Sequence, residues 1–288
     1  MLTIGGLVFL LACVFGSYLA SGGSIAPLAE ALPFELWTIG GAALGTFVMS
    51  NSMAEVKHTL GGFGRILKGG RFAKSDYIDL LSLLYFFVRL ASTKGAMALE
   101  PHIERPAESP AFQHFPRIIA NRHVTDMICD YLRMVGMNAD DTNQIEDVMA
   151  RELRKKLGEE LHGAHALQTM ADGLPALGIV AAVLGVIKTM SHINQPPAIL
   201  GAMIGGALTG TFLGVLLAYG MVGPFAARLK GVIEEEAKYY EVIRAVLVAH
   251  LHGNAPPVSV ETGRKMAPNR LMPSFQELET ATQNLQIA

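Results

Sequence analysis

Four long stretches of the chain are apolar and nearly free of charge, and they limit the possible folds more than any other feature. They cover residues 2–20, 36–53, 174–191 and 198–222, and Lys188 is the single Lys, Arg, Asp or Glu within them. A helix needs about 20 mostly apolar residues to cross the hydrocarbon core of a bilayer. Lys188 lies near the end of its stretch, where the ammonium group can reach the membrane surface. The sequence therefore predicts four membrane-spanning helices.

The composition and the distribution of basic residues agree with a membrane protein. Hydrophobic residues make up 51% of the 288 residues and charged residues 17%, against about 25% charged in an ordinary soluble domain. All of the 23 Lys and Arg residues except Lys188 lie in residues 52–173 or 225–288. Loops rich in Lys and Arg stay on the cytoplasmic side of a membrane. Both of these segments are therefore predicted to be cytoplasmic, and the loop at 21–35 is predicted to face outward.

The predicted fold class is an all-α membrane protein. It has four transmembrane helices, a large helical cytoplasmic insert between the second and third, and a cytoplasmic C-terminal tail. The predicted regions are a first transmembrane helix pair (1–53), a cytoplasmic helical domain (54–173), a second transmembrane helix pair (174–224), and a C-terminal helix and tail (225–288).

The insert is predicted to be helical on both sides of a proline-rich loop. An apolar, periodic helix is expected over residues 76–99, and a second helix over 122–135. The loop between them contains Pro101, Pro106, Pro110 and Pro116. A turn is expected at 138–143, where Asp141 or Thr142 can cap a charged helix that runs into the third span.

No pattern typical of an enzyme, a metal site or a nucleic-acid-binding protein occurs in the sequence. The nine histidines lack the cysteine or carboxylate partners of a zinc site, and no Gly-rich phosphate-binding loop is present. The net charge of −2 provides no basic surface for nucleic acid. Cys13 and Cys129 are too few for a disulfide framework, and both are expected to be reduced.

The fourth span carries closely spaced glycines and two threonines. Gly206, Gly210 and Gly214 recur every four residues, a spacing that lets helix backbones approach closely. Thr209 and Thr211 either bond back to their own helix, or Thr211 lies beside a hydrated ion path. Pro175, near the start of the third span, and Pro224, just after the fourth, either begin and end helices or provide a hinge and a free carbonyl.

The four predicted spans contain no Asp or Glu. Ion channels and pumps usually place an ionisable group within the membrane. Two interpretations follow from this absence. Either the protein does not move ions, or a second subunit supplies the carboxylate.

Several segments resemble the MotA family of flagellar stator subunits. Residues 174–186 (LPALGIVAAVLGV) are similar to that family's third transmembrane helix, and residues 210–220 (GTFLGVLLAYG) to its fourth. The tail segments 255–257, 261–265 and 273–279 are similar to its C-terminus. The resemblance also includes the glycines around the first span and the segment from Leu99 to Ile118, so it covers nearly the whole chain.

The resemblance implies a role, partners and a location. The chain would form a ring of five copies around a pair of MotB chains in the bacterial inner membrane. MotB, a single-span partner anchored to peptidoglycan, would supply the ion-binding aspartate. Pro175 and Pro224 match the family's two functional prolines, and Glu100 and Glu152 match acidic positions that engage the rotor protein FliG.

The family's rotor-facing arginine aligns with Ser92 in this chain. Arg89 and Lys94 stand within one helical turn of Ser92, and residues three apart on a helix are neighbours. Either side chain can supply the positive charge, and Lys94 is the preferred candidate.

The translocated ion is predicted to be a proton, with no cofactor. Sodium-driven relatives carry a threonine where this chain has Ala182, and sodium needs several oxygen ligands. Three alternatives remain at this point: a sodium-driven stator, an ExbB or TolQ type of proton-driven energiser, and a membrane scaffold that conducts nothing. The energisers typically have three spans, and a scaffold does not explain Pro175, Thr211 and Pro224 together.

Overall fold

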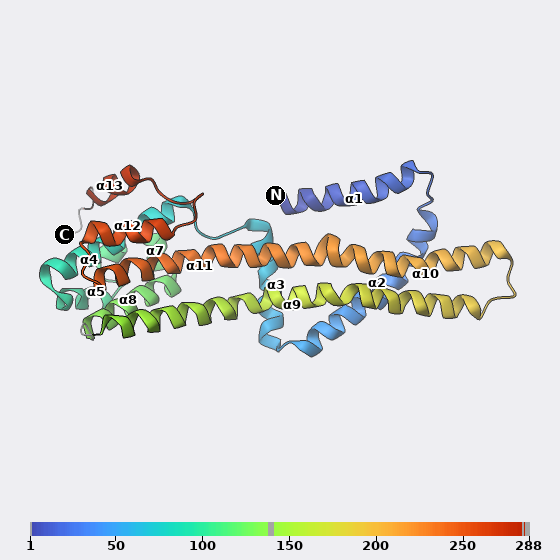
Figure 1. Ribbon diagram of the computed structural model, residues 1–288, viewed down its shortest axis with the longest axis horizontal. Coiled ribbons are helices and arrows are strands. Elements are labelled where there is room, and N and C mark those ends of the chain that lie inside the picture. The colour runs from blue at the N-terminus through green and yellow to red at the C-terminus, as the bar shows by residue number, and fades with distance from the viewer. Residues whose placement is uncertain (1, 138–140, 284, 286–288) are drawn as a thin grey trace. The chain divides into compact units, whose positions relative to one another are not determined.

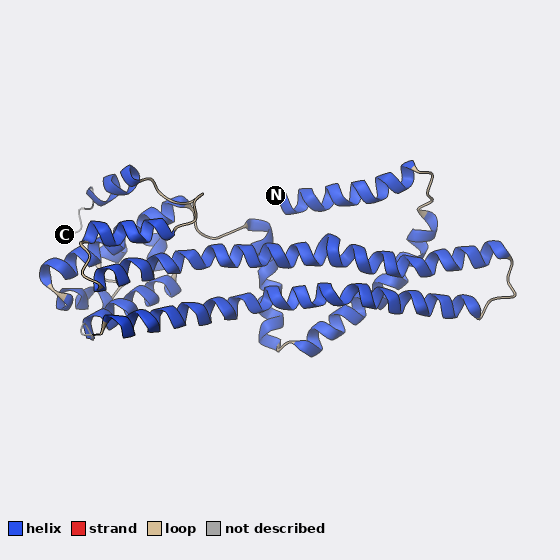
Figure 2. Ribbon diagram, in the orientation of Figure 1, coloured by secondary structure: helices blue, strands red, loops and turns tan. Residues whose placement is uncertain are grey.

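The structure, a computed structural model, describes residues 2–137, 141–283 and 285, and within these ranges every regular element is a helix (Figures 1 and 2). The longer helices are α1 (Leu2–Ala20), α2 (Ala26–Ser50), α3 (Met53–Lys68), α4 (Lys74–Lys94), α8 (Arg122–Met137), α9 (Thr142–Met190), α10 (Pro197–Leu217) and α11 (Gly223–Leu251). The shorter ones are α5 (Glu100–Glu104), α6 (Pro110–Gln113), α7 (Pro116–Ala120), α12 (Pro256–Met266) and α13 (Phe275–Gln283).

Within the described residues, four helices are long and apolar enough to cross a membrane, as predicted, and they include α1, α2, part of α9 and α10. The second predicted span is wrong at its start, because α2 begins at Ala26 rather than at residue 36. Two carboxylates, Glu30 and Glu35, therefore lie within α2. The expectation that the spans lack Asp and Glu is corrected accordingly.

The third and fourth spans are parts of longer helices. α9 runs without interruption from the charged segment into the apolar one, as predicted. α10 continues through a π-helical turn, Ala218–Val222, into α11. Within this turn the Gly223 N–H donates to the Ala218 carbonyl, five residues earlier. Such turns occur mostly as single insertions in α-helices, frequently at functional sites.

The insert differs from the prediction in two places. The first helix ends at Lys94, because Gly95 takes φ +83°, a conformation that favours glycine. The expected proline-rich loop instead forms α5, α6 and α7. Each of these short helices has a proline in its first turn, where the missing N–H has no intrahelical partner to lose.

The cap predicted before the charged helix is confirmed. The Gln144 N–H donates to Asp141 Oδ1 at 3.0 Å, which satisfies one of the free amides of the first turn of α9. Residues 138–140 of the predicted turn lie outside the described residues. Cys13 and Cys129 are both free thiols, and burial raises the pKa of Cys129 to about 12.

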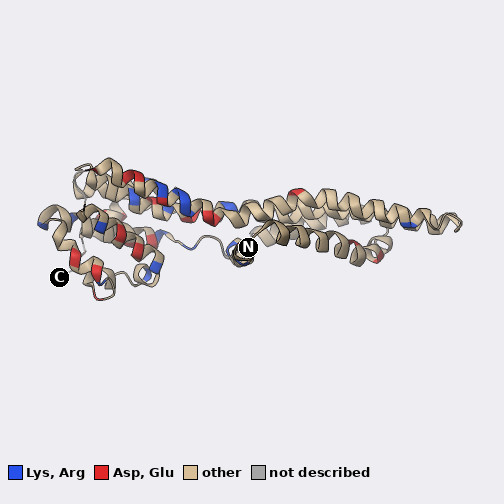
Figure 3. Cartoon of the chain, turned by 90° about the horizontal axis from the view of Figure 1, so that it is seen from below, with Lys and Arg blue, Asp and Glu red and all other residues tan. Residues whose placement is uncertain are grey.

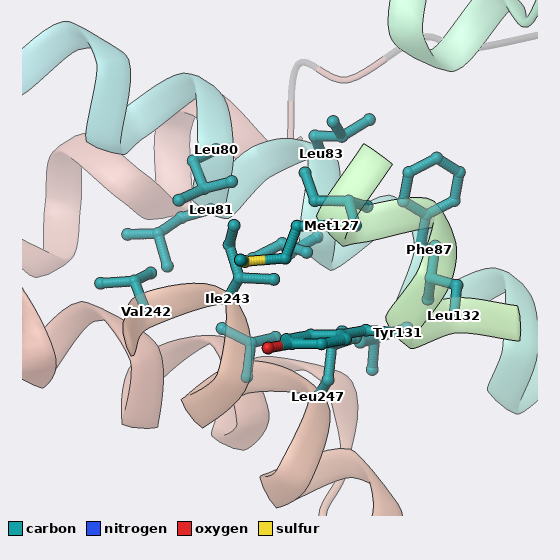
Figure 4. Close-up of a cluster of buried hydrophobic side chains, with 14 of the residues drawn as sticks. Leu80, Leu81, Leu83, Phe87, Met127, Tyr131, Leu132, Val242, Ile243 and Leu247 are labelled. Atoms are coloured by element: carbon teal, nitrogen blue, oxygen red, sulfur yellow. The ribbon is translucent and has the colours of Figure 1, made fainter. Parts of the chain in front are cut away.

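The chain divides into two compact units, each built from two separate segments. Unit 1 contains Met1–Gly69 and Glu160–Val232, and unit 2 contains Gly70–Glu159 and Ile233–Ala288. Charged side chains are frequent on the helices of unit 2 and sparse on the apolar helices of unit 1 (Figure 3). Side chains of α4, α8 and α11 form a hydrophobic core in unit 2 (Figure 4). Burial of this apolar surface stabilises the unit.

In unit 1, α3 is fixed to α9 and α11 by named contacts. Ser52 and Glu55 form a capping box at its start. Arg65 donates to Glu160 of α9 at 2.6 Å. Phe63 meets Phe225 of α11 edge to face, with ring centroids 6.3 Å apart.

The C-terminal helices of unit 2 are held by a buried arginine. Arg264 donates to both carboxylate oxygens of Glu261 at 2.6 Å and to the Pro273 carbonyl at 2.8 Å. The side chain of Arg264 is 7% exposed, and its hydrogen bonds hold the pKa of Glu261 below the usual value. A bidentate pair of this kind fixes geometry as well as charge.

We expect Glu261→Gln to destabilise the protein by about 2–3 kcal/mol, because it leaves the buried guanidinium without its anion. Thermal unfolding of the solubilised protein measures the effect as a fall in melting temperature. Lys265→Gln is the matched control, since Lys265 meets the same carboxylate at 3.9 Å from an exposed position. Equal melting temperatures for wild type and Glu261→Gln would contradict this role of the pair.

Candidate functional site

The apolar parts of α9 and α10 meet along a line of small residues, which we call the α9–α10 seam: Gly178, Ala181 and Gly185 of α9 with Ala207, Gly210 and Gly214 of α10. A Cβ on Gly178 would lie 2.8 Å from the Gly210 carbonyl oxygen. A Cβ on Gly185 would lie 2.6 Å from the Cβ of Ala207. The seam therefore brings two backbones into direct contact, as small residues allow in membrane helices.

The three glycines predicted to pack helices have different surroundings. Gly210 and Gly214 lie in the seam. Gly206 instead faces α2, where a Cβ on it would lie 3.8 Å from the Cβ of Ala31. A distance of 3.8 Å is an ordinary van der Waals contact, so a methyl group would fit at Gly206. Of these three glycines, Gly210 and Gly214 are the ones whose neighbours leave no room for a side chain.

The two threonines of α10 are in different states. Thr209 is buried and donates to the Gly205 carbonyl at 3.1 Å. Thr211 is half-buried next to the seam, and its hydroxyl has no hydrogen-bond partner among the described residues. A hydroxyl that is not used by its own helix can bind water or an ion. This difference favours Thr211 over Thr209 as a group on an ion path.

Ala182 lies at the same level of the seam. A Cβ on Gly210 would be 3.2 Å from the Ala182 backbone nitrogen. The side chain of Ala182 is half-buried and offers no oxygen. Where Gly210 and Ala182 meet, α9 therefore contributes only small apolar groups. The nearby hydroxyl is that of Thr211 on α10.

The two prolines lie toward the end of the seam that holds Gly178 and Gly214. Pro175 is inside α9 and cannot donate to the Ala171 carbonyl, four residues earlier. Pro224 is the second residue after the π-helical turn, and it cannot donate to the Gly220 carbonyl in the same way. Each proline thus leaves a carbonyl without its usual donor in a helix that forms the seam.

Sequence reasoning missed Glu35 of α2 in unit 1. Its Oε2 atom is buried and has no hydrogen-bond partner among the described residues. A Cβ on Gly210 would lie 2.7 Å from this oxygen. The four-residue spacing of Glu35 from Ile39 and Ala43 was the available signal, because it places a carboxylate on the apolar face of a helix.

The candidate rotor residues belong to unit 2, whereas the residues of the seam belong to unit 1. Arg89 and Lys94 are exposed on the last turns of α4, and Glu100 is exposed at the start of α5. None of these three charges has an ion-pair partner within the described part of the chain. Ser92 is exposed between them and donates to the Val88 carbonyl at 2.8 Å. Free charges on a surface are available to a partner.

Glu152 occupies a separate place on α9. It is exposed, and its carboxylate, together with burial, raises the pKa of Tyr131 on α8. Burial is the larger of the two causes. The charge of Glu152 therefore acts on a side chain of α8, whereas Glu100 has no ion-pair partner among the described residues.

Comparison with known proteins gives the family. Residues 4–95 match the family described as "Motility protein A N-terminal", and residues 119–242 match the "MotA/TolQ/ExbB proton channel family". Motility protein A of Escherichia coli (strain K12) is 40% identical over 97% of this chain and 94% of the relative. The chain belongs to the motility protein A family.

Other members of this family agree over the same length. Motility protein A of Salmonella typhimurium is 39% identical over 97% of this chain and 94% of its own length. Chemotaxis protein LafT of Vibrio parahaemolyticus is 29% identical over 95% of each chain. The MotA-type assignment therefore extends over both units.

Solved structures share the fold. A chain of the MotAB structure from C. jejuni superposes with a TM-score of 0.73 at 20% identity, over 95% of this chain and 98% of that one. A chain of the flagellar MotAB stator complex from Bacillus subtilis gives a TM-score of 0.70 at 22% identity, over 94% and 98%. The helical arrangement described above is thus that of MotA-type chains.

Proposed function

We propose that this chain is the ring-forming subunit of a proton-driven flagellar stator in the bacterial inner membrane. Five copies surround a pair of MotB chains, which supply the ion-binding aspartate and the peptidoglycan anchor. Proton flow through the assembly is converted into torque on the rotor protein FliG. The membership in the motility protein A family and the structural similarity to chains of solved MotAB complexes support this proposal.

The observation that carries the proposal is the α9–α10 seam. It places the free Thr211 hydroxyl next to two closely packed backbones, with a proline in the helix on each side. A water chain along such a hydroxyl can conduct protons. One elementary charge that crosses 100 mV releases about 2.3 kcal/mol, which is sufficient to reposition a helix in each step.

Both large segments are cytoplasmic in this proposal. The basic residues of 52–173 and 225–288 support the orientation. The free charges of Arg89, Lys94 and Glu100 then face the cytoplasm, where the rotor lies. The N-terminal match to the motility protein A family, over residues 4–95, favours a stator over an ExbB or TolQ type of energiser.

The test of this function is motility in a deletion strain. Cells that lack their own MotA-type chain, with flagella verified by microscopy, should swim when this chain is expressed with its MotB partner. Swimming should collapse with a protonophore. At fixed pH and ionic strength, swimming speed should not depend on external sodium, because Ala182 provides no hydroxyl to help to replace the hydration shell of sodium.

Two results would overturn parts of the proposal separately. Speed that rises and saturates with external sodium would show a sodium-driven stator. Flagella that remain paralysed, with the chain and its partner present in the membrane, would exclude the stator role itself.

We expect Glu100→Lys to reduce torque strongly, because it reverses a free charge on the proposed rotor face. Torque on a tethered cell or an attached bead measures the effect. A charge reversal on the rotor should restore part of it, as expected for paired surface charges. Glu108→Lys is the control, since Glu108 is also exposed and pairs with Arg105 of its own surface at 3.3 Å. Unchanged torque in Glu100→Lys, and in a Lys94→Glu and Arg89→Glu double variant, would remove this contact.

A further inference from the structure

Glu35 lies on the packed face of α2. The buried residues of this helix are Ile39, Ala43 and Phe47, at 0%, 3% and 9% exposure. They recur every four residues, and Glu35 continues the same row by one more step toward the start of the helix. Residues four apart lie on one face of a helix. The row packs against α10, so a carboxylate is directed into a helix interface that is otherwise apolar.

The carboxylate fits a space that only glycine leaves. Its buried Oε2 atom lies where a Cβ on Gly210 would come within 2.7 Å. The other atoms nearest to this Cβ position are the Ala181 Cβ at 3.0 Å and the Ala182 nitrogen at 3.2 Å. Gly210 therefore does more than let two helices approach, because it also makes room for the Glu35 oxygen.

Glu35 is far from either end of the helices around it. At a rise of about 1.5 Å per residue it lies about 14 Å along α2 from Ala26, and Gly210 lies about 20 Å along α10 from Pro197. The hydrocarbon core of a bilayer is about 30 Å thick. The oxygen therefore lies within segments that are long and apolar enough to cross a membrane, where an ionisable group is a candidate functional site by default.

Neither the helix macrodipole nor an ion pair stabilises a charged Glu35 side chain among the described residues. The helix macrodipole stabilises anions only in the first turn of a helix, and Glu35 lies beyond it. No cation pairs with it among the described residues. α10 has no charged residue, and the charged residues of α9 that flank its apolar part are Asp172 and Lys188. Glu30, the other carboxylate of α2, is exposed.

We propose that Glu35 is a second proton-binding group of the stator, located on this chain and lying beside the α9–α10 seam. The inference rests on the proposed function. In this proposal the half-buried carboxyl group rests as the neutral acid, because its Oε2 atom is buried without a donor and a charge there would be costly. When water reaches the group, the O–H bond breaks, the proton passes to water, and the carboxylate remains until it takes up the next proton.

The surroundings select a proton over a metal ion. A sodium ion needs several oxygen ligands to replace its hydration shell. Around the space that Gly210 leaves for Oε2, the nearest other atoms are a methyl carbon and a backbone nitrogen. No group of three or more His, Cys, Asp or Glu residues that could hold a metal occurs in the part of the chain that the structure describes. A single carboxyl group can bind a proton without further ligands.

The experiment compares Glu35→Gln, Glu35→Asp and the control Glu30→Gln, each expressed with the MotB partner in the deletion strain. Swimming speed should fall about tenfold or more in Glu35→Gln, the scale on which proton-transfer groups act. Glu35→Asp should retain part of the speed, and Glu30→Gln all of it. Infrared spectra of the purified complex provide the second readout. The C=O band of a neutral carboxylic acid should be present in wild type and Glu30→Gln and weaker in Glu35→Gln.

The outcomes separate this inference from the proposed function. Wild-type swimming that collapses with a protonophore, together with normal speed in Glu35→Gln, overturns the role of Glu35 alone. An unchanged infrared band in Glu35→Gln overturns it as well. If Glu35→Gln does not reach the membrane, Glu35→Asp and Glu35→Leu are compared at equal membrane levels. Motility with Asp and paralysis with Leu supports the proposal, and equal motility overturns it.

Discussion

Gly214→Ala is expected to abolish swimming and to lower the thermal stability of the protein. A Cβ at this position would lie 2.8 Å from the Leu174 carbonyl oxygen and 2.9 Å from the Gly178 Cα. Both are backbone atoms, so no side chain can rotate away and the two helices must move apart. Overpacking of this kind costs about 1–3 kcal/mol. Swimming in soft agar and the melting temperature of the solubilised protein measure the two effects.

Gly201→Ala is the matched control on the same helix, because nothing lies within 4 Å of a Cβ at that position. It should swim and melt like the wild type. Normal swimming by Gly214→Ala at normal membrane levels would show that the described contact at the seam is not required.

Pro175→Ala and Pro224→Ala are each expected to leave the protein inserted and flagella assembled, but to paralyse the motor. Alanine at residue 175 supplies an N–H for the Ala171 carbonyl, which removes the local freedom of α9. Alanine at residue 224 supplies an N–H for the Gly220 carbonyl, which lies within the π-helical turn. Motility assays with immunoblots of the membrane fraction measure the outcome.

The control for the prolines is Pro257→Ala. Pro257 is exposed in the first turn of α12, where its ring only starts a helix. This variant should swim normally. A swimming Pro175→Ala or Pro224→Ala at normal expression would exclude the corresponding proline from the mechanism.

Hydropathy predicted that four spans exist but misplaced the start of the second. The residues between 26 and 35 include Pro27, Glu30, Pro33 and Glu35, which lower the mean hydropathy of any window that contains them. Hydropathy assigns one cost to every Glu. It does not register that α10 offers a glycine opposite Glu35, because that space exists only once α2 and α10 are packed.

The candidate site was predictable in residue type but not in geometry. Thr209 and Thr211 are two residues apart, about 200° around the helix, so their neighbours differ completely. The sequence alone left both roles open, because only the position of α9 decides which threonine faces the seam. The exposure of Arg89, Lys94 and Glu100 followed from their charge, whereas the effect of Glu152 on the pKa of Tyr131 depends on tertiary packing.

The π-helical turn between α10 and α11 has a consequence for motion in unit 1. A π turn contains one residue more than the α-helical turn it replaces, which amounts to about 100° of extra winding and about 1.5 Å of rise. The position of such an extra residue can shift along the helix when a backbone N–H breaks its hydrogen bond to one carbonyl and forms one to the neighbouring carbonyl. Each such step would turn the adjacent part of the helix by the angle of one residue while the remaining hydrogen bonds stay intact. Pro224 has no N–H to exchange, so no hydrogen bond has to break at that residue, the second after the turn.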